Sequence, residues 1–338
     1  MAQKEYATEE EVEGIVQHVR ALQESLNGVL FGQSELIDLV IVGLLARGHI
    51  LLEGLPGLGK TELVKGLSKA LGLDTKRVQF TPDLLPGDIT GNPVLQENEG
   101  RRSFVFQPGP LFTNLVLADE INRASPKTQS ALLEAMQERC VTVLGETHSL
   151  PAPFFVLATQ NPIELEGTYP LPEAQLDRFL FKLEVGRNSA ETLEQIVLKR
   201  ELGEDPVVEE IMTPSEFKSL VDLVRRVYLP DVVANYIARL VTATHPGESK
   251  ASSHIKFGAS PRAALSLASA AKARAVMHER VHTSFEDVAA VAPAVLRHRV
   301  LLDYSAQIEG LTVNDVLEAI LNEVPNQNQA TPKSLKSV

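Results

Sequence analysis

The most informative segment of the chain, residues 54–61, reads Gly54-Leu55-Pro56-Gly57-Leu58-Gly59-Lys60-Thr61. It fits the pattern G-x-x-x-x-G-K-[ST], in which glycines let the backbone turn tightly and aim successive N–H groups at phosphate oxygens. In this pattern the lysine reaches the β and γ phosphates of a nucleotide, and the threonine hydroxyl holds Mg²⁺. The segment and the residue after it therefore predict a phosphate site formed by Gly54, Pro56, Gly57, Leu58, Gly59, Lys60, Thr61 and Glu62.

The residues on either side of this segment support the same interpretation. The apolar run His49-Ile50-Leu51-Leu52 predicts a buried strand, and Leu63, Leu67 and Leu71 recur at helical spacing. The loop therefore lies between a strand and the N-terminus of a helix, where backbone N–H groups attract phosphate. The alternative is a glycine-rich turn that happens to precede Lys-Thr, and it does not explain the strand and the helix together.

Composition limits the kind of protein. The chain has 338 residues, which suits two domains, and its 44% of apolar residues is typical of a soluble globular enzyme. Its net charge of −12 is spread along the sequence, which disfavours nucleic-acid binding through a basic face. Cys140 is the single cysteine, Met1–Glu5 lacks an apolar signal core, and the apolar stretch Leu36–Leu45 is too short to span a membrane. We therefore expect a cytoplasmic protein without a membrane span.

Short apolar runs alternate with helical segments in the first half of the chain, which predicts a parallel, doubly wound α/β domain over residues 1–187. Glycine- and proline-rich stretches predict inserted hairpins at about 88–108 and 141–148. Residues 188–324 have an almost purely helical pattern and predict a second, helical domain, and the polar tail 325–338 is expected to be disordered. The predicted strands are Ile50–Glu53, Arg77–Phe80, Leu115–Ala118, Phe154–Ala158 and Phe179–Val185.

Two adjacent carboxylates follow the apolar strand Leu115–Ala118. Asp119 can hold Mg²⁺ directly or through water, and Glu120 can act as general base toward the attacking water. The alternative, an acidic cap of the next helix, is common for such a pair. The phosphate loop upstream favours the catalytic interpretation.

Three further polar residues are candidates for the same site. Asn161 follows another apolar strand and can orient the attacking water, although Asn-Pro is also a common turn. Arg178 is a candidate arginine finger that acts on the γ-phosphate of a neighbouring subunit, the alternative being a surface pair with Asp177. Arg262 follows Ser260-Pro261, a helix start that would fix it on a lid over the nucleotide, unless it is only a solvated helical arginine.

In this order, these segments resemble those of the AAA+ ATPases, and more narrowly the MoxR family, over about residues 10–320. The phosphate loop resembles the Walker A motif, Asp119-Glu120-Ile121-Asn122-Arg123-Ala124 the Walker B motif, and Ala158-Thr159-Gln160-Asn161-Pro162 sensor 1. The segment Leu171–Phe179 is similar to the arginine-finger segment, and Ser260-Pro261-Arg262 to sensor 2. The resemblance implies a five-stranded sheet of order 5-1-4-3-2, a helix-2 insert, a pre-sensor-1 hairpin, and a helical lid. It also implies that Phe31-Gly32-Gln33, with Gly32 and Gln33 as candidate ligands, lies beside the adenine.

The function implied by this resemblance is Mg²⁺-dependent ATP hydrolysis by a ring, with six subunits as the family expectation. Its hydrolysis would remodel or activate a client protein complex, together with a separate partner of the von Willebrand factor A type. The main alternative is a DNA-dependent motor, which the acidic charge and the lack of a recognisable DNA-binding module disfavour. A third alternative is a nucleotide-dependent scaffold or switch that hydrolyses little ATP. The presence of Glu120 and Arg178 disfavours it.

One motif points elsewhere. His278-Glu279-Arg280-Val281-His282 fits the zinc-protease pattern H-E-x-x-H, which requires both histidines on one face of a continuous helix. Thr283 and Glu286 have the spacing of a capping box, so a new helix is expected to begin there and to leave His282 in a turn. The sequence therefore predicts no zinc site at this motif.

Overall fold

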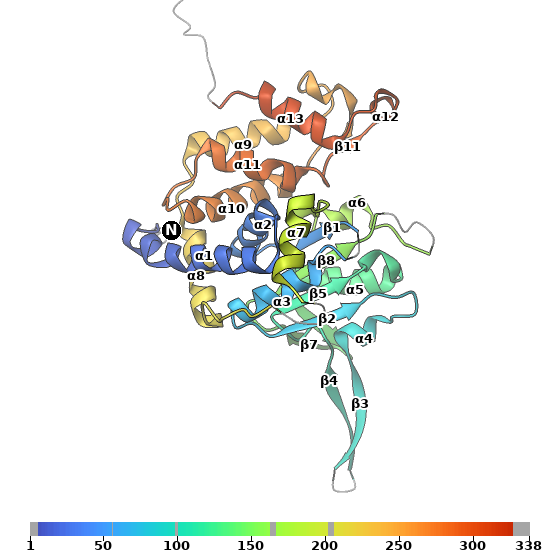
Figure 1. Cartoon of the computed structure of the whole chain (residues 1–338). Helices are drawn as coiled ribbons and strands as arrows, with labels where there is room; N and C mark the ends of the chain where they lie inside the picture. Colours follow the sequence, from blue (N-terminus) through green and yellow to red (C-terminus); the bar gives the residue numbers. More distant parts are fainter. Residues whose placement is uncertain (1–5, 56, 99–100, 163–166, 202–205, 327–338) are drawn as a thin grey trace, which may run out of the picture. The chain divides into compact units, whose positions relative to one another are not determined.

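The computed structural model describes residues 6–55, 57–98, 101–162, 167–201 and 206–326. Pro56 of the phosphate loop and the predicted tail beyond Asn326 lie outside these ranges. The chain forms two compact units, one of residues Glu10–Val224 and one in which the residues up to Glu9 join those from Arg225 onward. Figure 1 shows both units with most of their helices and strands labelled.

The first unit contains a sheet of five parallel strands in the order β2-β5-β8-β1-β9. Numbered as five consecutive strands and counted from the opposite edge, this is the order 5-1-4-3-2, so the expected fold is confirmed. The register aligns Leu52 of β1 with Thr159 of β8, and Gln79 of β2 with Asp119 of β5. The strands are β1 (Ile50–Glu53), β2 (Thr75–Gln79), β5 (Leu115–Asp119), β8 (Phe155–Gln160) and β9 (Phe181–Glu184).

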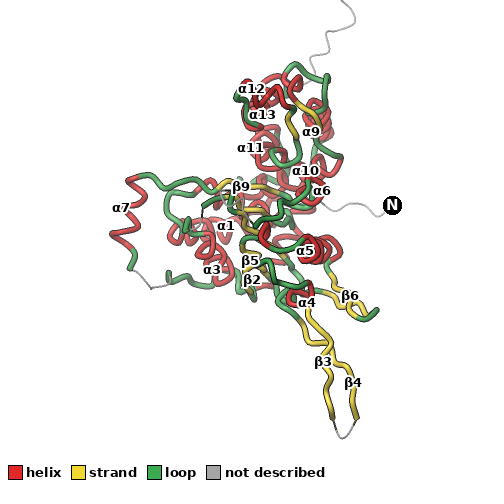
Figure 2. The backbone as a smooth tube through the Cα atoms, turned by 90° about the vertical axis from the view of Figure 1, so that its right-hand side faces the viewer, coloured by secondary structure: helices red, strands yellow, loops and turns green. Residues whose placement is uncertain are grey.

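Helices cover both faces of this sheet. Figure 2 shows α3 (Lys60–Ala70) on one side and α4 (Pro86–Thr90) and α5 (Pro126–Glu138) on the other. Both-sided burial explains why the inner strands are continuously apolar instead of alternating. Helix α5 begins where Ser125 Oγ accepts a hydrogen bond from the Thr128 backbone N–H, followed by Pro126 at the first helical position.

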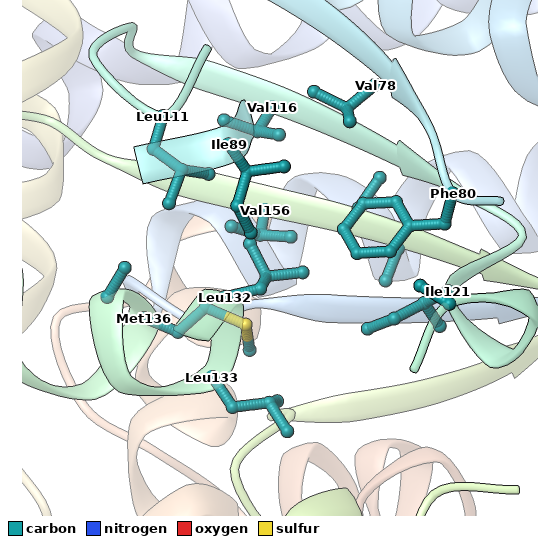
Figure 3. Close-up of a cluster of buried hydrophobic side chains, with 14 of the residues drawn as sticks. Val78, Phe80, Ile89, Leu111, Val116, Ile121, Leu132, Leu133, Met136 and Val156 are labelled. Carbon is teal, nitrogen blue, oxygen red and sulfur yellow. The ribbon is translucent and has the colours of Figure 1, made fainter. Parts of the chain in front are cut away.

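The core beneath α5 is drawn in Figure 3. Side chains from three neighbouring strands meet the apolar face of the helix, and all are at most 7% exposed. Burial on this scale stabilises by about 1.5–3 kcal/mol for each large apolar side chain. The strand residues are Val78, Val116 and Val156, and the helix contributes Leu132, Leu133 and Met136.

Two antiparallel hairpins interrupt the alternation of strands and helices at the places where the sequence predicts them. The first, β3 (Gly91–Asn98) with β4 (Arg101–Pro108), projects from the unit in Figures 1 and 2. The second is β6 (Cys140–Val143) with β7 (Glu146–Ser149). The rings of Phe106 and His148 stack with their centroids 4.0 Å apart, so the two hairpins touch near their bases.

The boundary between the compact units differs from the predicted one at residue 187. Helix α7 (Ala190–Lys199) and most of α8 (Pro214–Arg226) belong to the first unit. The physical reason is that the chain after the sheet returns to a helix of the first unit: Arg200 donates to the carbonyls of Gly28 and Val29, at the end of α1 (Glu9–Val29). The end of the strands at Glu184 therefore marks the end of the sheet but not of the unit.

The second unit is largely helical, as the sequence predicts, and also contains a small antiparallel pair that it does not predict, β10 (Ile255–Phe257) with β11 (Leu301–Leu302). Asp287, in the first turn of α11, is fully buried and is bonded by Arg274, Arg280 and Ser284. The main helices are α9 (Asp231–Ala243), α10 (Pro261–Met277), α11 (Phe285–Leu296), α12 (Tyr304–Glu309) and α13 (Val313–Glu323).

The H-E-x-x-H segment does not form a continuous helix. Helix α10 ends at Met277, and Glu279 has a left-handed backbone with φ of 60°. The two histidines therefore do not share a helix face, and within the described ranges no cluster of three or more metal-ligating side chains occurs. In those same ranges, no helix is both long and apolar enough to cross a membrane.

Candidate functional site

The phosphate loop joins β1 to α3, as its sequence predicts. Gly57 and Gly59 have φ values of 81° and 82°, a region that favours glycine. A Cβ at Gly59 would also collide with the Leu30 side chain. Helix α3 begins at Lys60 directly after Gly59, so its first N–H groups face the loop.

Lys60 is held by the loop that carries it. Its Nζ donates to the Gly54 carbonyl oxygen at 2.8 Å, which aligns the side chain along the loop. Burial lowers the pKa of Lys60, and the nearby charges of Asp119 and Glu120 partly offset this effect. A lysine in this position can exchange one carbonyl partner for a phosphate oxygen.

The Thr159 hydroxyl fixes the two carboxylates at the end of β5. It donates to Asp119 Oδ1 at 2.5 Å and accepts from the Glu120 backbone N–H at 2.9 Å. Glu120 has a left-handed backbone with φ of 56°, which turns its side chain away from the line of the strand. Neighbouring strands β5 and β8 thus set the position of both carboxylates.

Basic and amide side chains surround these carboxylates. Arg77 Nη2 lies 2.7 Å from Asp119 Oδ2, and Gln79 Nε2 donates to Glu120 Oε2 at 2.8 Å. Arg123 Nη1 also donates to Glu120 Oε2, at 2.9 Å. Glu120 is therefore turned toward β2 and Arg123, and must leave these partners before it can serve a water molecule at a bound phosphate.

These groups line one pocket of about 350 Å³. It combines the start of a helix, one lysine and two carboxylates at the C-terminal ends of parallel strands, which is where ligands bind in open α/β sheets. Arg77 and Gln79 also line it, although no motif in the sequence predicted them. The described lining residues are Gly57, Gly59, Lys60, Thr61, Glu62, Arg77, Gln79, Asp119, Glu120 and Asn161.

The remaining candidates do not line this pocket in the part of the chain that the structure describes. Gly54 contributes its carbonyl to Lys60, and Leu58 is half-buried in the loop. Gln33, next to Gly32, instead donates to Gly186 and Asn188. Arg178 lies half-buried in the same unit between α6 (Glu173–Leu176) and β9, whereas Arg262 begins α10 in the other unit.

The donor set suits a magnesium ion held together with phosphate. Asp119 supplies a carboxylate and Thr61 a hydroxyl, both hard oxygen ligands, and both line the pocket. Magnesium is generally bound by one or two carboxylates plus substrate phosphates and water, and not by a complete protein cage. The observed residues fit that arrangement.

Comparisons with known proteins agree with this architecture. Residues 49–181 match the model "ATPase family associated with various cellular activities (AAA)", and residues 247–320 match the AAA lid domain. The chain is 40% identical to the chaperone MoxR1 of Mycobacterium tuberculosis, over 96% of this chain and 89% of that protein. The chain belongs to the MoxR family of AAA+ ATPases. As a MoxR-family protein it binds and hydrolyses ATP, which confirms the predicted enzyme class.

Two further comparisons cover nearly the whole chain. The uncharacterized protein YeaC of Bacillus subtilis is 45% identical over 91% of this chain and 95% of its own length. The crystal structure of a Cytophaga hutchinsonii protein superposes with a TM-score of 0.86 at 38% identity, covering 94% of this chain and 97% of that one. The likeness therefore extends over both units and not only over the phosphate loop.

Proposed function

We propose that this chain forms a ring of subunits, six by family expectation, whose Mg²⁺-dependent ATP hydrolysis remodels or activates a partner protein complex. Similarity to a protein named as a chaperone supports the remodelling role. The partner would be separate, of the von Willebrand factor A type, and the complex would work in the cytoplasm. The predicted domain limits, 1–187 and 188–324, remain a proposal of where nucleotide binding ends and the lid begins.

Each residue of the pocket has a proposed task in hydrolysis. The loop and Lys60 would bind the phosphates, and Thr61 and Asp119 would hold Mg²⁺. The metal ion would offset the negative charge of the phosphates. Glu120 accepts a proton from the water that attacks the γ-phosphorus, and Asn161 orients that water. ADP leaves as the bond from the β–γ bridging oxygen to phosphorus breaks.

The observation that carries the ring proposal is the position of Arg178. Among the described residues, the pocket contains the other two catalytic candidates of this unit, Glu120 and Asn161, yet Arg178 does not line it. An arginine finger contributed by another subunit raises hydrolysis by about 10³–10⁵-fold. Arg178 would act in the pocket of the neighbouring subunit, with Arg262 on the lid as a second positive charge.

Mixing two inactive variants tests the shared site. Lys60→Ala cannot use its own pocket but still offers Arg178, whereas Arg178→Ala has an intact pocket but no finger. Each alone should be nearly inactive, and mixtures should regain hydrolysis at interfaces that combine an intact pocket with an intact finger. No recovery at any ratio, with assembly verified by light scattering, would contradict a site shared between subunits.

A trapping experiment tests the remodelling role. The variant Glu120→Gln should hold ATP without turnover and so retain its partner, which we expect to contain a von Willebrand factor A-type domain. ATP hydrolysis by the unmodified chain should not respond to duplex or single-stranded DNA at low salt. A several-fold stimulation by DNA would instead favour the motor alternative.

A further inference from the structure

Two amide side chains, Asn122 and Gln129, lie buried behind the carboxylates of the pocket. Asn122 follows Glu120 in the short helical turn Ile121–Arg123, and Gln129 is in the first half of α5. Their exposed fractions are 3% and 0%, and neither is among the lining residues of the pocket. They cannot act on a bound nucleotide directly.

Their hydrogen bonds connect two segments that are distant in the sequence. Gln129 Nε2 donates to the carbonyl oxygens of Tyr169 at 2.9 Å and of Ile121 at 3.1 Å. The Tyr169 backbone N–H donates to the Asn122 carbonyl at 2.6 Å. The backbone of Tyr169 is thus bonded to the turn after Glu120 directly through its N–H, and its carbonyl is bonded to that turn through the Gln129 amide.

Asn122 also reaches the strand end that carries Asn161. Its Nδ2 lies 3.5 Å from the Asn161 carbonyl oxygen, at the long limit of a hydrogen bond. The turn after Glu120 therefore contacts both the Asn161 segment and the Tyr169 segment. These bonds link the segment that carries the pocket carboxylates to Tyr169.

The chain from Tyr169 to Arg178 is short and restrained. Pro170 and Pro172 fix their φ angles, and Leu171 is packed in the core at 7% exposure. The single turn α6 (Glu173–Leu176) follows, and the Arg178 backbone N–H donates to the Gln175 carbonyl. The position of Tyr169 consequently restricts the position from which Arg178 can extend.

These amides carry an energetic cost that apolar side chains would avoid. Asn122 Oδ1 and Gln129 Oε1 are buried without a hydrogen-bond partner among the described residues. A buried acceptor left unpaired destabilises the folded state, because it has lost its bond to water. The donor groups of the two amides must therefore provide something besides stability.

We infer that Gln129, together with Asn122, positions the arginine finger. The pair joins the segment that carries Glu120 to the segment that carries Arg178. Nucleotide bound in the pocket of one subunit would thereby fix the position of that subunit's own Arg178, which acts in the pocket of its neighbour. This inference rests on the proposed shared site. Gln129 is a positioning residue in it and touches neither nucleotide nor water.

The variant Gln129→Met tests this inference, because it keeps the side-chain volume and removes both hydrogen bonds. A displacement of about 1 Å in a catalytic group can lower the rate by about 10²-fold, which is the loss we expect for the variant alone. Its pocket should still bind a fluorescent ATP analogue as tightly as the unmodified chain does. A variant that keeps full hydrolysis would contradict the inference.

Mixing separates a finger defect from a pocket defect. Gln129→Met should regain hydrolysis with Lys60→Ala, which supplies fingers, and not with Arg178→Ala, which supplies only pockets. The opposite pattern, or recovery with neither, would overturn the inference. Failure of the reference mixture of Lys60→Ala with Arg178→Ala would instead refute the proposed shared site itself.

A matched control is available one residue earlier on the same helix. Thr128 is also fully buried, and its hydroxyl donates to the Leu84 carbonyl at 2.7 Å, away from the finger segment. Thr128→Val should lower stability similarly but keep hydrolysis near that of the unmodified chain. A loss as large as that of Gln129→Met would show that helix α5 acts only through general packing.

A measurement on the unmodified chain needs no variant to fold. Binding of a non-hydrolysable ATP analogue should slow hydrogen exchange of the Tyr169 backbone N–H, because the turn after Glu120 becomes fixed. Arg178→Ala should show the same slowing, since the coupling lies within one subunit. Unchanged exchange at Tyr169 in both proteins would overturn the inference.

Discussion

The molecule contains two clusters of carboxylates and arginines that differ in completeness. In the helical unit, Asp287 is fully buried and both its oxygens are bonded: Oδ1 by Arg274 and Arg280, and Oδ2 by Arg280 and Ser284. In the pocket of the α/β unit, the side chains of Asp119 and Glu120 remain 16% and 22% exposed. Their basic partners are still more open to solvent.

The difference separates a structural cluster from the proposed functional one. Burial by itself raises the pKa of Asp287, but bonds from Arg280, Ser284 and Arg274 outweigh it and hold the pKa below the ordinary value. Such a cluster has no free capacity for a ligand. Around Asp119 and Glu120, the exposed partners can be exchanged for metal and water at little cost, because surface ion pairs contribute only about 0–1 kcal/mol.

The largest expected effect breaks the functional cluster. Glu120→Gln should lower ATP turnover by about 10²–10⁴-fold, the usual contribution of a general base, and leave the urea midpoint of unfolding unchanged. Steady-state phosphate release and equilibrium unfolding would measure both quantities. A normal rate would mean that another group takes the proton from water.

The opposite result is expected for the structural cluster. Asp287→Asn should lower the free energy of unfolding by about 3 kcal/mol, the low end for a broken buried pair, because Arg274 and Arg280 are partly exposed. Since the folded-state pKa of Asp287 is depressed, its stabilisation is complete above the unfolded-state pKa of about 3.8 and declines below it.

Urea unfolding at pH 7 and at progressively lower pH would measure the stability that Asp287 contributes. The difference between the unmodified chain and Asp287→Asn should narrow as the carboxyl protonates. A constant difference down to pH 2 would show that charge is not what Asp287 contributes.

A buried histidine extends the comparison to a neutral group. His49 Nδ1 accepts from the Val156 N–H, and Nε2 lies 3.1 Å from the Met136 carbonyl, to which it donates. Burial lowers the pKa of His49 from 6.5 to about 4. The hydrogen bond to Met136 raises this pKa, and the charge of Arg139 lowers it further. The unfolded chain therefore binds a proton first as pH falls.

We therefore expect the free energy of unfolding to fall by about 3 kcal/mol between pH 6.5 and pH 4. The full stability is present above the unfolded-state pKa of 6.5, and it is lost as the pH falls toward the folded-state value of about 4. Unfolding titrations at several pH values would reveal the slope. His49→Phe should be less stable at every pH but should lack the slope that His49 contributes. An identical slope in both proteins would assign it to other groups.

The smallest effect tests the openness of the pocket cluster. Arg123→Gln removes the ion pair with Glu120 and should change the free energy of unfolding by no more than about 1 kcal/mol, because Arg123 is 40% exposed. A substantially larger loss would place this pair with the structural cluster of Asp287.

The sequence predicted the α/β fold and most of the pocket because the relevant residues directly follow apolar strands. Asp119, Glu120 and Asn161 were found in this way. Arg77 and Gln79 were missed. They are two residues apart on β2 and so lie on the same face of the strand, which the sequence could have indicated.

Other features had no local signal in the sequence. Gln129 lies within an ordinary amphipathic helix, and only the fold brings Tyr169 to it. The compact units divide after Val224 and not at the proposed limit of 187, because helices α7 and α8 resemble those of the helical unit in pattern and only packing assigns them to the α/β unit. For the H-E-x-x-H segment the sequence predicted the break in the helix, but it placed the capping box at Thr283 and Glu286, one residue before the Ser284–Asp287 box of the structure.

Strand β2 has a second consequence, for the solubility of the protein. It lies at the edge of the five-stranded sheet, and edge strands tend to recruit foreign strands into aggregates. Lys76, Arg77 and Gln79 are exposed along it, and charged side chains discourage such growth. Arg77 and Gln79, which bond the carboxylates of Asp119 and Glu120, are thus also expected to protect this sheet edge against aggregation.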